Sequence, residues 1–264
     1  MKIAKNVNNL GTELVYDIFS KTKKLQSQGK KIIDLSLGQS AESPPEYVIE
    51  ATIKALRDGN NGYTVPNGIL ECREAVSRKI QKLYNAKISP ERIFIVPGGK
   101  PTMHYAISFF GEPGTEIIYP DPGFPIYESM IRYTGAKPVS YNLSDKDNFN
   151  ISVEKIVSLI NDKTRLFIIN NPHNPTGSFA DKSLIDKLAN ALLKYPNVAI
   201  LSDEIYGRLI FEKKEFPTFF NYPELYERLI VLDGWSKTYA MTGWRLGWGV
   251  WPEKLLDKMF KFCV

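Results

Sequence analysis

Apolar residues recur along the chain with two different periods, and each period predicts one kind of element. Between Leu10 and Gln28 they fall three or four positions apart, which is typical of an amphipathic helix, and Gly29 closes that helix. The same spacing predicts further helices at 44–58, 70–84, 101–110, 124–133, 153–160, 181–194 and 255–262.

Short apolar runs bounded by turn residues predict the strands. They lie at 32–37, 93–96, 116–119, 138–141, 165–170, 198–202, 229–233 and 246–250. From residue 93 onward strands and helices alternate, which favours a mainly parallel sheet with helices on both faces, an α/β three-layer sandwich. Ligands of such sheets bind beyond the carboxyl ends of the strands, so the residues there are the first candidates for a site.

The composition fits a globular protein and argues against several other classes. Of the 264 residues, 43% are hydrophobic and 24% are charged. The apolar runs, such as 166–169 and 198–201, are far shorter than the roughly 20 residues of a membrane helix. The first nine residues lack the apolar core of a signal peptide. We therefore expect no membrane association and a cytoplasmic location.

The cysteines, histidines and charges narrow the chemistry further. Cys72 and Cys263 are too few for a disulfide framework, and His104 and His173 lie far apart without ligand spacing, so we expect no metal site. The net charge is only +5, and the lysine pairs are scattered along the chain. Without a basic stripe interleaved with aromatic residues, we expect no nucleic-acid partner.

A glycine-rich turn follows the predicted strand at 93–96. Gly98, Gly99 and Lys100 precede Pro101, which suits the first turn of a helix. Free backbone N–H groups at such a turn bind anions, most naturally phosphate, although many such turns only reverse the chain. The turn matches neither the G-x-G-x-x-G nor the Walker pattern, so a phosphate there belongs to something other than NAD or ATP.

Further polar groups follow the other predicted strands. Asn174 stands in a turn with two prolines and a glycine, which would hold its amide in place. Asp203 and Tyr206 end the next strand, where a lone aspartate is commonly a helix cap. Lys237 comes after a third strand, among small and apolar residues, with Arg245 eight positions on. A lysine shielded from solvent has a lowered pKa and forms Schiff bases with carbonyl groups.

Together these blocks resemble the class I and II aminotransferases, the pyridoxal-phosphate enzymes of the aspartate aminotransferase fold. The similarity extends through essentially the whole chain and keeps the order of the family's motifs. In chain order the matching positions are Gly38, Tyr63, Gly98-Gly99-Lys100, Phe124, Asn174-Pro175-Thr176-Gly177, Asp203, Tyr206, Ser236-Lys237 and Arg245.

The resemblance implies a role for these residues around the cofactor, pyridoxal 5′-phosphate. Lys237 would form an aldimine with it and then act as general base and acid at the substrate Cα. Asp203 would pair with the pyridine nitrogen, and Asn174 and Tyr206 with the phenolic oxygen. Phe124 would stack on the ring.

The resemblance also places the cofactor phosphate and the second subunit. The phosphate would rest on the backbone N–H groups of Gly99 and Lys100, with Ser236 and Arg245 adding a hydroxyl and a charged contact. Tyr63 would reach the phosphate of the neighbouring subunit, which implies a homodimer with shared sites.

Two glycines complete the comparison with the family. Gly38 would lie where the backbone approaches the substrate carboxylate, and Asn174 would also contact the substrate. Gly234 stands where the family often has a hydroxyl residue, three positions before Lys237. We therefore expect one phosphate contact to be missing.

The function implied is transfer of an amino group from an L-amino acid to a 2-oxo acid, with Lys237, Asp203 and Tyr206 as catalytic residues. Two alternatives remain open. One is another pyridoxal-phosphate activity on the same fold, such as that of a carbon–sulfur lyase. The other is a domain that binds the cofactor without catalysis. The side chain of the substrate is not specified.

The resemblance divides the chain at residue 45. Residues 1–45 would form an N-terminal arm and part of a small domain, and 46–264 the large cofactor-binding domain. Family members continue beyond the position of Val264, and the arginine that binds the substrate α-carboxylate lies in that region. We therefore expect the 264 residues alone to bind the cofactor weakly and to show little amino transfer.

Overall fold

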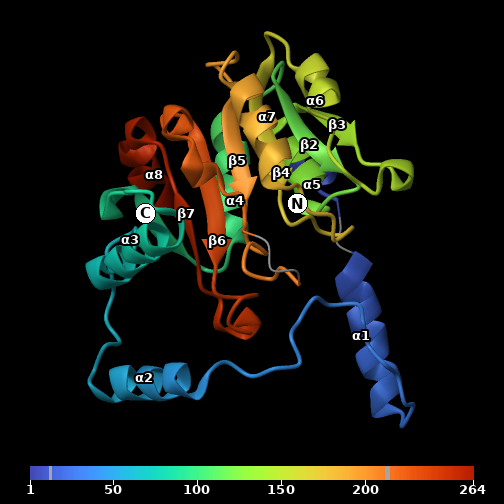
Figure 1. Cartoon of the computed structure of the whole chain (residues 1–264). Coiled ribbons are helices and arrows are strands. Elements are labelled where there is room, and N and C mark those ends of the chain that lie inside the picture. The colour runs from blue at the N-terminus through green and yellow to red at the C-terminus, as the bar shows by residue number, and fades with distance from the viewer. Residues whose placement is uncertain (12–13, 212–214) are drawn as a thin grey trace.

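A computed structural model of the chain describes residues 1–11, 14–211 and 215–264. Its centre is a seven-stranded sheet between α-helices (Figure 1). The strands are β1 (Ile93–Val96), β2 (Glu116–Asp121), β3 (Lys137–Asn142), β4 (Thr164–Asn170), β5 (Ala199–Asp203), β6 (Leu229–Gly234) and β7 (Gly247–Val250). The helices are α1 (Leu14–Ser27), α2 (Glu46–Arg57), α3 (Leu70–Tyr84), α4 (Lys100–Phe110), α5 (Ile126–Thr134), α6 (Val153–Leu159), α7 (Lys182–Leu192) and α8 (Leu256–Cys263).

The strand order is β1-β7-β6-β5-β4-β2-β3. Five neighbouring strands, from β6 to β3, run parallel, and β7 runs antiparallel to both β6 and β1. The register pairs Asn170 with Asp203 and Asp203 with Leu232. The carboxyl ends of β4, β5 and β6 therefore lie side by side at one edge of the sheet, where the polar residues of the motifs follow.

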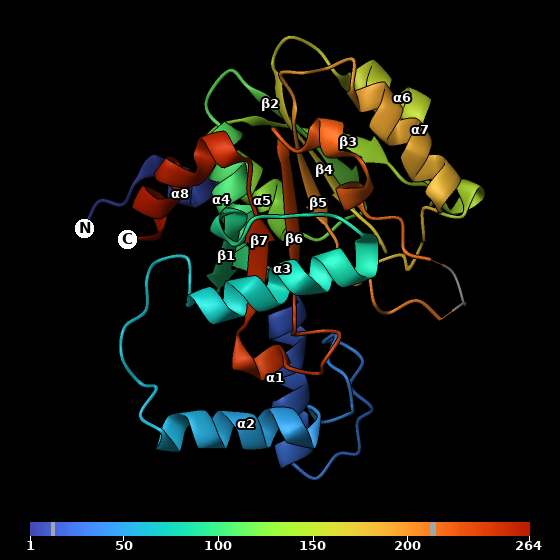
Figure 2. The ribbon, with the colours of Figure 1, turned by 60° about the vertical axis from the view of Figure 1, so that its left-hand side comes forward.

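Helices cover both faces of the sheet (Figure 2). On one face α3, α6 and α7 pack against strand residues that include Phe167 and Ile200. On the other face α4, α5 and α8 pack against residues that include Ile168 and Leu201. Successive residues of β4 and β5 thus enter opposite cores, which explains why these strands are continuously apolar. The predicted three-layer α/β sandwich with a mainly parallel sheet is confirmed.

The predicted strand at 32–37 is wrong. These residues have no regular secondary structure, and the side chains of Ile33 and Leu35 are 90% and 89% exposed. A strand needs a neighbour for its backbone hydrogen bonds, and no strand of the described residues pairs with this segment. The other predicted strands and helices are present with small shifts at their ends, although residues 12 and 13 of the first predicted helix lie outside the described residues.

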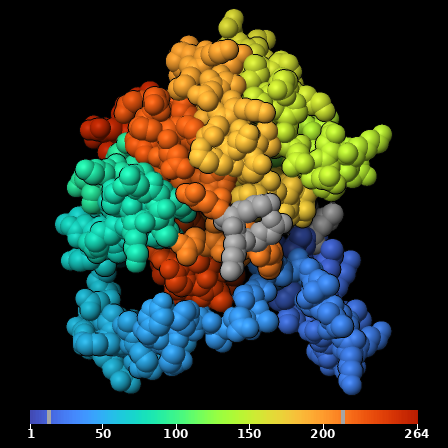
Figure 3. Space-filling model, viewed as in Figure 1, coloured from blue at the N-terminus to red at the C-terminus, as the bar shows by residue number. Residues whose placement is uncertain are grey.

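The N-terminal helices α1 and α2 stand apart from the layers of the sandwich (Figures 1 and 3). Helix α2 buries none of its residues, although its sequence is amphipathic. Among the described residues, no helix is long and apolar enough to cross a membrane.

Candidate active site

Lys237 lies in the turn after β6, where its amine meets residues from distant parts of the chain. Its Nζ donates a hydrogen bond to the carbonyl of Gly38 at 2.5 Å and lies 5.8 Å from the centroid of the Tyr206 ring. Burial lowers the pKa of this amine, and the positive charges of Arg245 and Lys100 lower it further. Compared with an exposed lysine, a larger fraction of this amine is therefore in the neutral, nucleophilic form.

Asp203 is buried at the end of β5, next to β6, the strand that precedes the Lys237 turn. Its Oδ2 accepts a hydrogen bond from the hydroxyl of Tyr127 at 2.6 Å, and its Oδ1 accepts one from the backbone N–H of Ile205 at 3.2 Å. Burial raises the pKa of Asp203 to about 6, the two hydrogen bonds oppose that rise, and the Asp233 carboxyl adds to it. The carboxyl group is thus mostly ionised at neutral pH and basic for an aspartate.

Asn174 and Tyr206 meet through their side chains. The amide Nδ2 of Asn174 donates to the Tyr206 hydroxyl at 3.3 Å, and the Asn174 backbone N–H donates to Asn170 Oδ1 at 2.8 Å. The amide of Asn170 also donates to the backbone carbonyl of Asp203 at 3.0 Å, so the turn carrying Asn174 is tied to the end of β5. Burial, followed by the Asp203 charge, raises the pKa of Tyr206 to about 12.

The guanidinium group of Arg245 lies against the glycine turn that precedes α4. Arg245 donates to the carbonyls of Thr242 at 2.8 Å and Pro97 at 3.4 Å, and it lies so close to Gly98 that a Cβ there would clash with it. Gly98 has a φ of 79°, and Gly99 caps α4. A helix N-terminus and a guanidinium therefore lie together, which is an arrangement suited to a phosphate.

Lys100 and Phe124 close another side of the site. Lys100 Nζ lies 5.2 Å from the centroid of the Phe124 ring and 5.6 Å from that of Tyr16. Phe124 also packs edge-on against Tyr127, with ring centroids 5.9 Å apart. Through Tyr127, the aromatic ring predicted to stack on the cofactor is connected to Asp203.

Three further predicted residues differ in their surroundings. Ser236 is buried next to Lys237. Tyr63, in contrast, is fully exposed between α2 and α3, so the structure does not bring its side chain to the site of its own chain. Gly234 has no room for a side chain, because a Cβ would lie 2.9 Å from the Cα of Gly247 and 3.1 Å from the carbonyl oxygen of Leu246. The close approach of β6 and β7 accounts for the glycine where the family often has a hydroxyl residue.

Tyr127 and Asn170 are the residues of the site that sequence reasoning missed. Tyr127 belongs to the buried face of α5, and Asn170 is the last residue of β4. From the sequence alone, Tyr127 indicated only packing in the core, and Asn170 indicated only the end of a strand. Their hydrogen bonds to Asp203 cross 76 and 33 residues of chain, and no local motif reports a partner at that separation.

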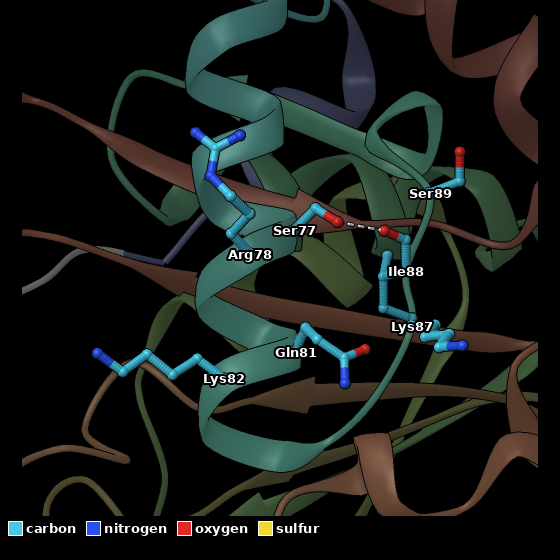
Figure 4. Close-up of a pocket in the computed structure, with 7 residues that line it drawn as sticks. All are labelled: Ser77, Arg78, Gln81, Lys82, Lys87, Ile88 and Ser89. Carbon is cyan, nitrogen blue, oxygen red and sulfur yellow. Dashed lines mark hydrogen bonds between the residues drawn. The ribbon is translucent and has the colours of Figure 1, made fainter.

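A hollow of about 480 Å³ lies between α3 and the segment 87–89 (Figure 4). Ser77 donates there to the carbonyl of Ile88 at 2.6 Å, whereas the side chains of Arg78 and Lys82 extend away from the segment 87–89. The lining residues are Ser77, Arg78, Gln81, Lys82, Lys87, Ile88 and Ser89. None of the residues described above takes part, so this hollow is separate from the candidate active site.

Residues 30–262 match the family described as aminotransferase class I and II. The chain is 34% identical over 260 residues to the (5-formylfuran-3-yl)methyl phosphate transaminase of Methanocaldococcus jannaschii, a match that covers 98% of this chain and 66% of that protein. It is 33% identical over 258 residues to the probable aspartate/prephenate aminotransferase of Rickettsia prowazekii, covering 97% and 65%. The chain thus spans just under two thirds of the length of these curated relatives.

A solved structure resembles the fold as a whole. The aspartate aminotransferase from Thermus thermophilus with maleate superposes with a TM-score of 0.93 at 28% sequence identity. The match covers 100% of this chain and 68% of that one.

Proposed function

Because the chain belongs to the class I and II aminotransferases, we propose that it binds pyridoxal 5′-phosphate and transfers an amino group from an L-amino acid to a 2-oxo acid. The observation that carries this proposal is the surroundings of Lys237. Its amine lies beside Tyr206, and its pKa is lowered by burial and by the positive charges of Arg245 and Lys100. The names of the relatives support the same reaction class.

The residues present fit this cofactor at each of its polar ends. The N-terminus of α4 and Arg245 suit the phosphate, and the buried carboxyl of Asp203 suits the pyridine nitrogen. The paired side chains of Asn174 and Tyr206 suit the phenolic oxygen. When bound, the cofactor supplies an aldehyde for the lysine and a ring that accepts electrons from the substrate Cα.

Each residue then has a stated task. Lys237 attacks a carbonyl as a neutral amine, a form that its lowered pKa favours, and, once released, moves a proton at the substrate Cα. Asp203 holds a proton on the ring nitrogen, and Tyr206 and Asn174 bind the phenolic oxygen. Phe124 shields the ring from water, and Ser236 adds a hydroxyl at the phosphate.

The substrate side and the assembly belong to the same proposal. Gly38, whose carbonyl accepts a hydrogen bond from Lys237, places its backbone beside the substrate carboxylate, and Asn174 also contacts the substrate. The chain forms a homodimer, to which the fully exposed Tyr63 contributes by reaching the site of the second copy. Residues 1–45 are an arm and part of a small domain, and 46–264 the large domain.

A cytoplasmic location completes the proposal. Both cysteines, Cys72 and Cys263, are free thiols, which fits a reducing compartment.

The test is to identify the lysine that bonds to the cofactor. The purified chain is mixed with pyridoxal phosphate, reduced with borohydride and digested, and the labelled peptide is identified by mass spectrometry. We expect the label on Lys237 and no specific label in Lys237→Ala, whereas Lys100→Ala keeps it. A label on Lys100 instead would overturn the assignment.

The reaction class is tested with the same preparation. An L-amino acid is added, and conversion of the cofactor to its amine form is followed by absorbance, together with release of ammonia and pyruvate. Formation of the amine form and its reversal by a 2-oxo acid support amino transfer, even at the low rate expected of these 264 residues alone. Release of ammonia and pyruvate without dependence on a 2-oxo acid would instead indicate a lyase.

A further inference from the structure

Tyr127 makes the shortest hydrogen bond to the carboxyl group of Asp203. The Tyr127 hydroxyl donates to Asp203 Oδ2 at 2.6 Å, and Tyr127 is completely buried. It lies near the start of α5, whereas Asp203 ends β5, so the contact joins a covering helix to the centre of the sheet.

The carboxyl group of Asp203 is held from two sides. Tyr127 binds Oδ2, and the backbone N–H of Ile205 binds Oδ1 at 3.2 Å. These two donors fix the plane of the group, and each oxygen keeps a further lone pair for a ligand. The orientation of the carboxyl group is therefore set before any ligand binds.

The charge of Asp203 depends on these donors more than on neighbouring ions. Burial favours the neutral form of Asp203, and the nearby Asp233 carboxyl also raises its pKa. Against them, the largest contribution that favours the ionised form is the Tyr127 hydrogen bond, followed by that of Ile205. Burial also raises the pKa of Tyr127 itself well above its ordinary value, so Tyr127 stays protonated and remains a donor at neutral pH.

We propose that Tyr127 is a positioning residue that keeps Asp203 ionised and oriented, and thereby keeps the proton on the cofactor ring nitrogen. This rests on the proposed function, in which Asp203 faces that nitrogen. A proton shared by a carboxylate and a pyridine nitrogen lies on the more basic partner. A hydroxyl that donates to the carboxylate makes it less basic, so the proton stays on the ring. Without the hydroxyl, the desolvated carboxylate takes the proton, and the ring loses the positive charge with which it accepts electrons.

The chain offers a matched pair of variants. Tyr127→Phe removes the hydroxyl and keeps the ring that packs against Phe124. Tyr141→Phe removes a second fully buried hydroxyl, which donates to the backbone carbonyl of Ile168 at 3.2 Å rather than to Asp203. Both variants lose one buried hydrogen bond, so a merely structural effect would appear in both.

The first measurement needs no cofactor. Aspartate side chains are labelled with ¹³C at the carboxyl carbon, the Asp203 signal is assigned by its loss in Asp203→Asn, and its pH midpoint is followed by NMR. We expect a wild-type midpoint near 6, a midpoint higher by about one unit in Tyr127→Phe, and no change in Tyr141→Phe. An unchanged midpoint in Tyr127→Phe would refute the proposal.

The second measurement uses pyridoxal phosphate labelled with ¹⁵N in the ring. We expect the nitrogen signal of a protonated ring in the wild type and in Tyr141→Phe at pH 7.5, and a shift toward the neutral-ring signal in Tyr127→Phe. In an Asp203→Asn background, Tyr127→Phe should cause no further shift, because the hydroxyl acts through the carboxylate. A protonated-ring signal in Tyr127→Phe would overturn the proposal.

The two measurements separate this proposal from the proposed function. If the wild type does not bond the cofactor through Lys237, the proposed function fails, and the carboxyl titration still decides whether Tyr127 controls Asp203. If Tyr127→Phe does not fold, site-specific replacement of Tyr127 by 3,5-difluorotyrosine, a stronger hydrogen-bond donor, gives the opposite test. The Asp203 midpoint should then fall, and a constant midpoint would refute the proposal.

Discussion

Glu204, next to Asp203 along the chain, is a buried carboxyl group with three hydrogen-bond donors. Its oxygens accept from the hydroxyls of Ser202 at 2.9 Å and Thr218 at 2.8 Å, and from the backbone N–H of Phe219 at 3.1 Å. Burial nevertheless raises the pKa of Glu204 from 4.5 to about 7. Below pH 7 the folded state therefore binds a proton more tightly at this residue than the unfolded state does.

This difference sets the sign of a stability change with pH. Between about pH 4.5 and 7 the folded state carries more protons at Glu204, so the free energy of unfolding falls as pH rises and levels off above 7. Glu204→Gln stays neutral and should remove a contribution on the order of 3 kcal/mol from that fall. Urea unfolding from pH 5 to 8 measures it, and the exposed Glu50→Gln on α2 is the control. A slope in Glu204→Gln equal to that of the wild type would contradict this prediction.

At the scale of residues, the sequence predicted those members of the candidate site that belong to a local motif. Lys237, Asp203 and Asn174 each stand at or after the end of a strand in a short block of defined order, and the structure places all three at one edge of the sheet. The partners that set their charge were not predictable in the same way. Tyr127 and Thr218 reach the two neighbouring carboxyl groups across 76 and 14 residues, through contacts that only the folded chain creates.

At the scale of elements, one buried ion pair joins α3 to the end of β6. Lys79 Nζ lies 3.1 Å from Asp233 Oδ2, and the two side chains are only 20% and 11% exposed. Lys79 also lies 5.4 Å from the centroid of the Trp248 ring on β7, and Asp233 Oδ1 accepts from the N–H of Gly234. Helix α3 is thereby connected to the strand from which the Lys237 turn starts.

Removing the positive charge of Lys79 should lower the free energy of unfolding more than removing the negative charge of Asp233. Lys79→Met leaves the Asp233 carboxylate buried without its partner, which should lower the free energy of unfolding by about 3 kcal/mol. Asp233→Asn keeps an acceptor for Gly234 and should cost less, and the double variant should recover part of the loss. Arg78→Met, which breaks an exposed pair with Glu74, should change stability by less than about 0.5 kcal/mol. Urea unfolding of the four variants provides the comparison, and additive losses would show that the pair is not coupled.

The apolar period predicted the strands of the central sheet well and failed for a segment outside it. Strand β4 is apolar because its residues enter two cores, and its bounds were close to those predicted from the sequence. Residues 32–37 have a similar apolar run, but no strand of the described residues lies beside them. A short run specifies that its side chains favour burial, and it does not specify which surface buries them.

At the scale of the whole molecule, several large apolar side chains are exposed in the N-terminal part of the chain, between α1 and α3. Ile33, Leu35, Tyr47, Tyr63 and Val65 all lie between α1 and α3 and are more than half exposed. Scattered apolar residues are normal on a surface, but a concentration of large ones in one segment is typical of an interface. The proposed homodimer would bury them against the second copy.

The homodimer predicts that charges in this segment weaken self-association and leave the fold intact. Burying each of Ile33 and Leu35 contributes about 1.5 kcal/mol or more, so Ile33→Asp with Leu35→Asp should raise the dimer dissociation constant at least roughly a hundredfold. The double variant should keep the wild-type circular dichroism, since these side chains touch neither core of the monomer. Leu193→Asp with Leu209→Asp adds the same charge at exposed positions elsewhere and should leave the dissociation constant unchanged. Sedimentation equilibrium over a range of concentrations measures all three proteins. A wild-type chain that stays monomeric, or equal weakening by the two double variants, would show that this segment is not the interface.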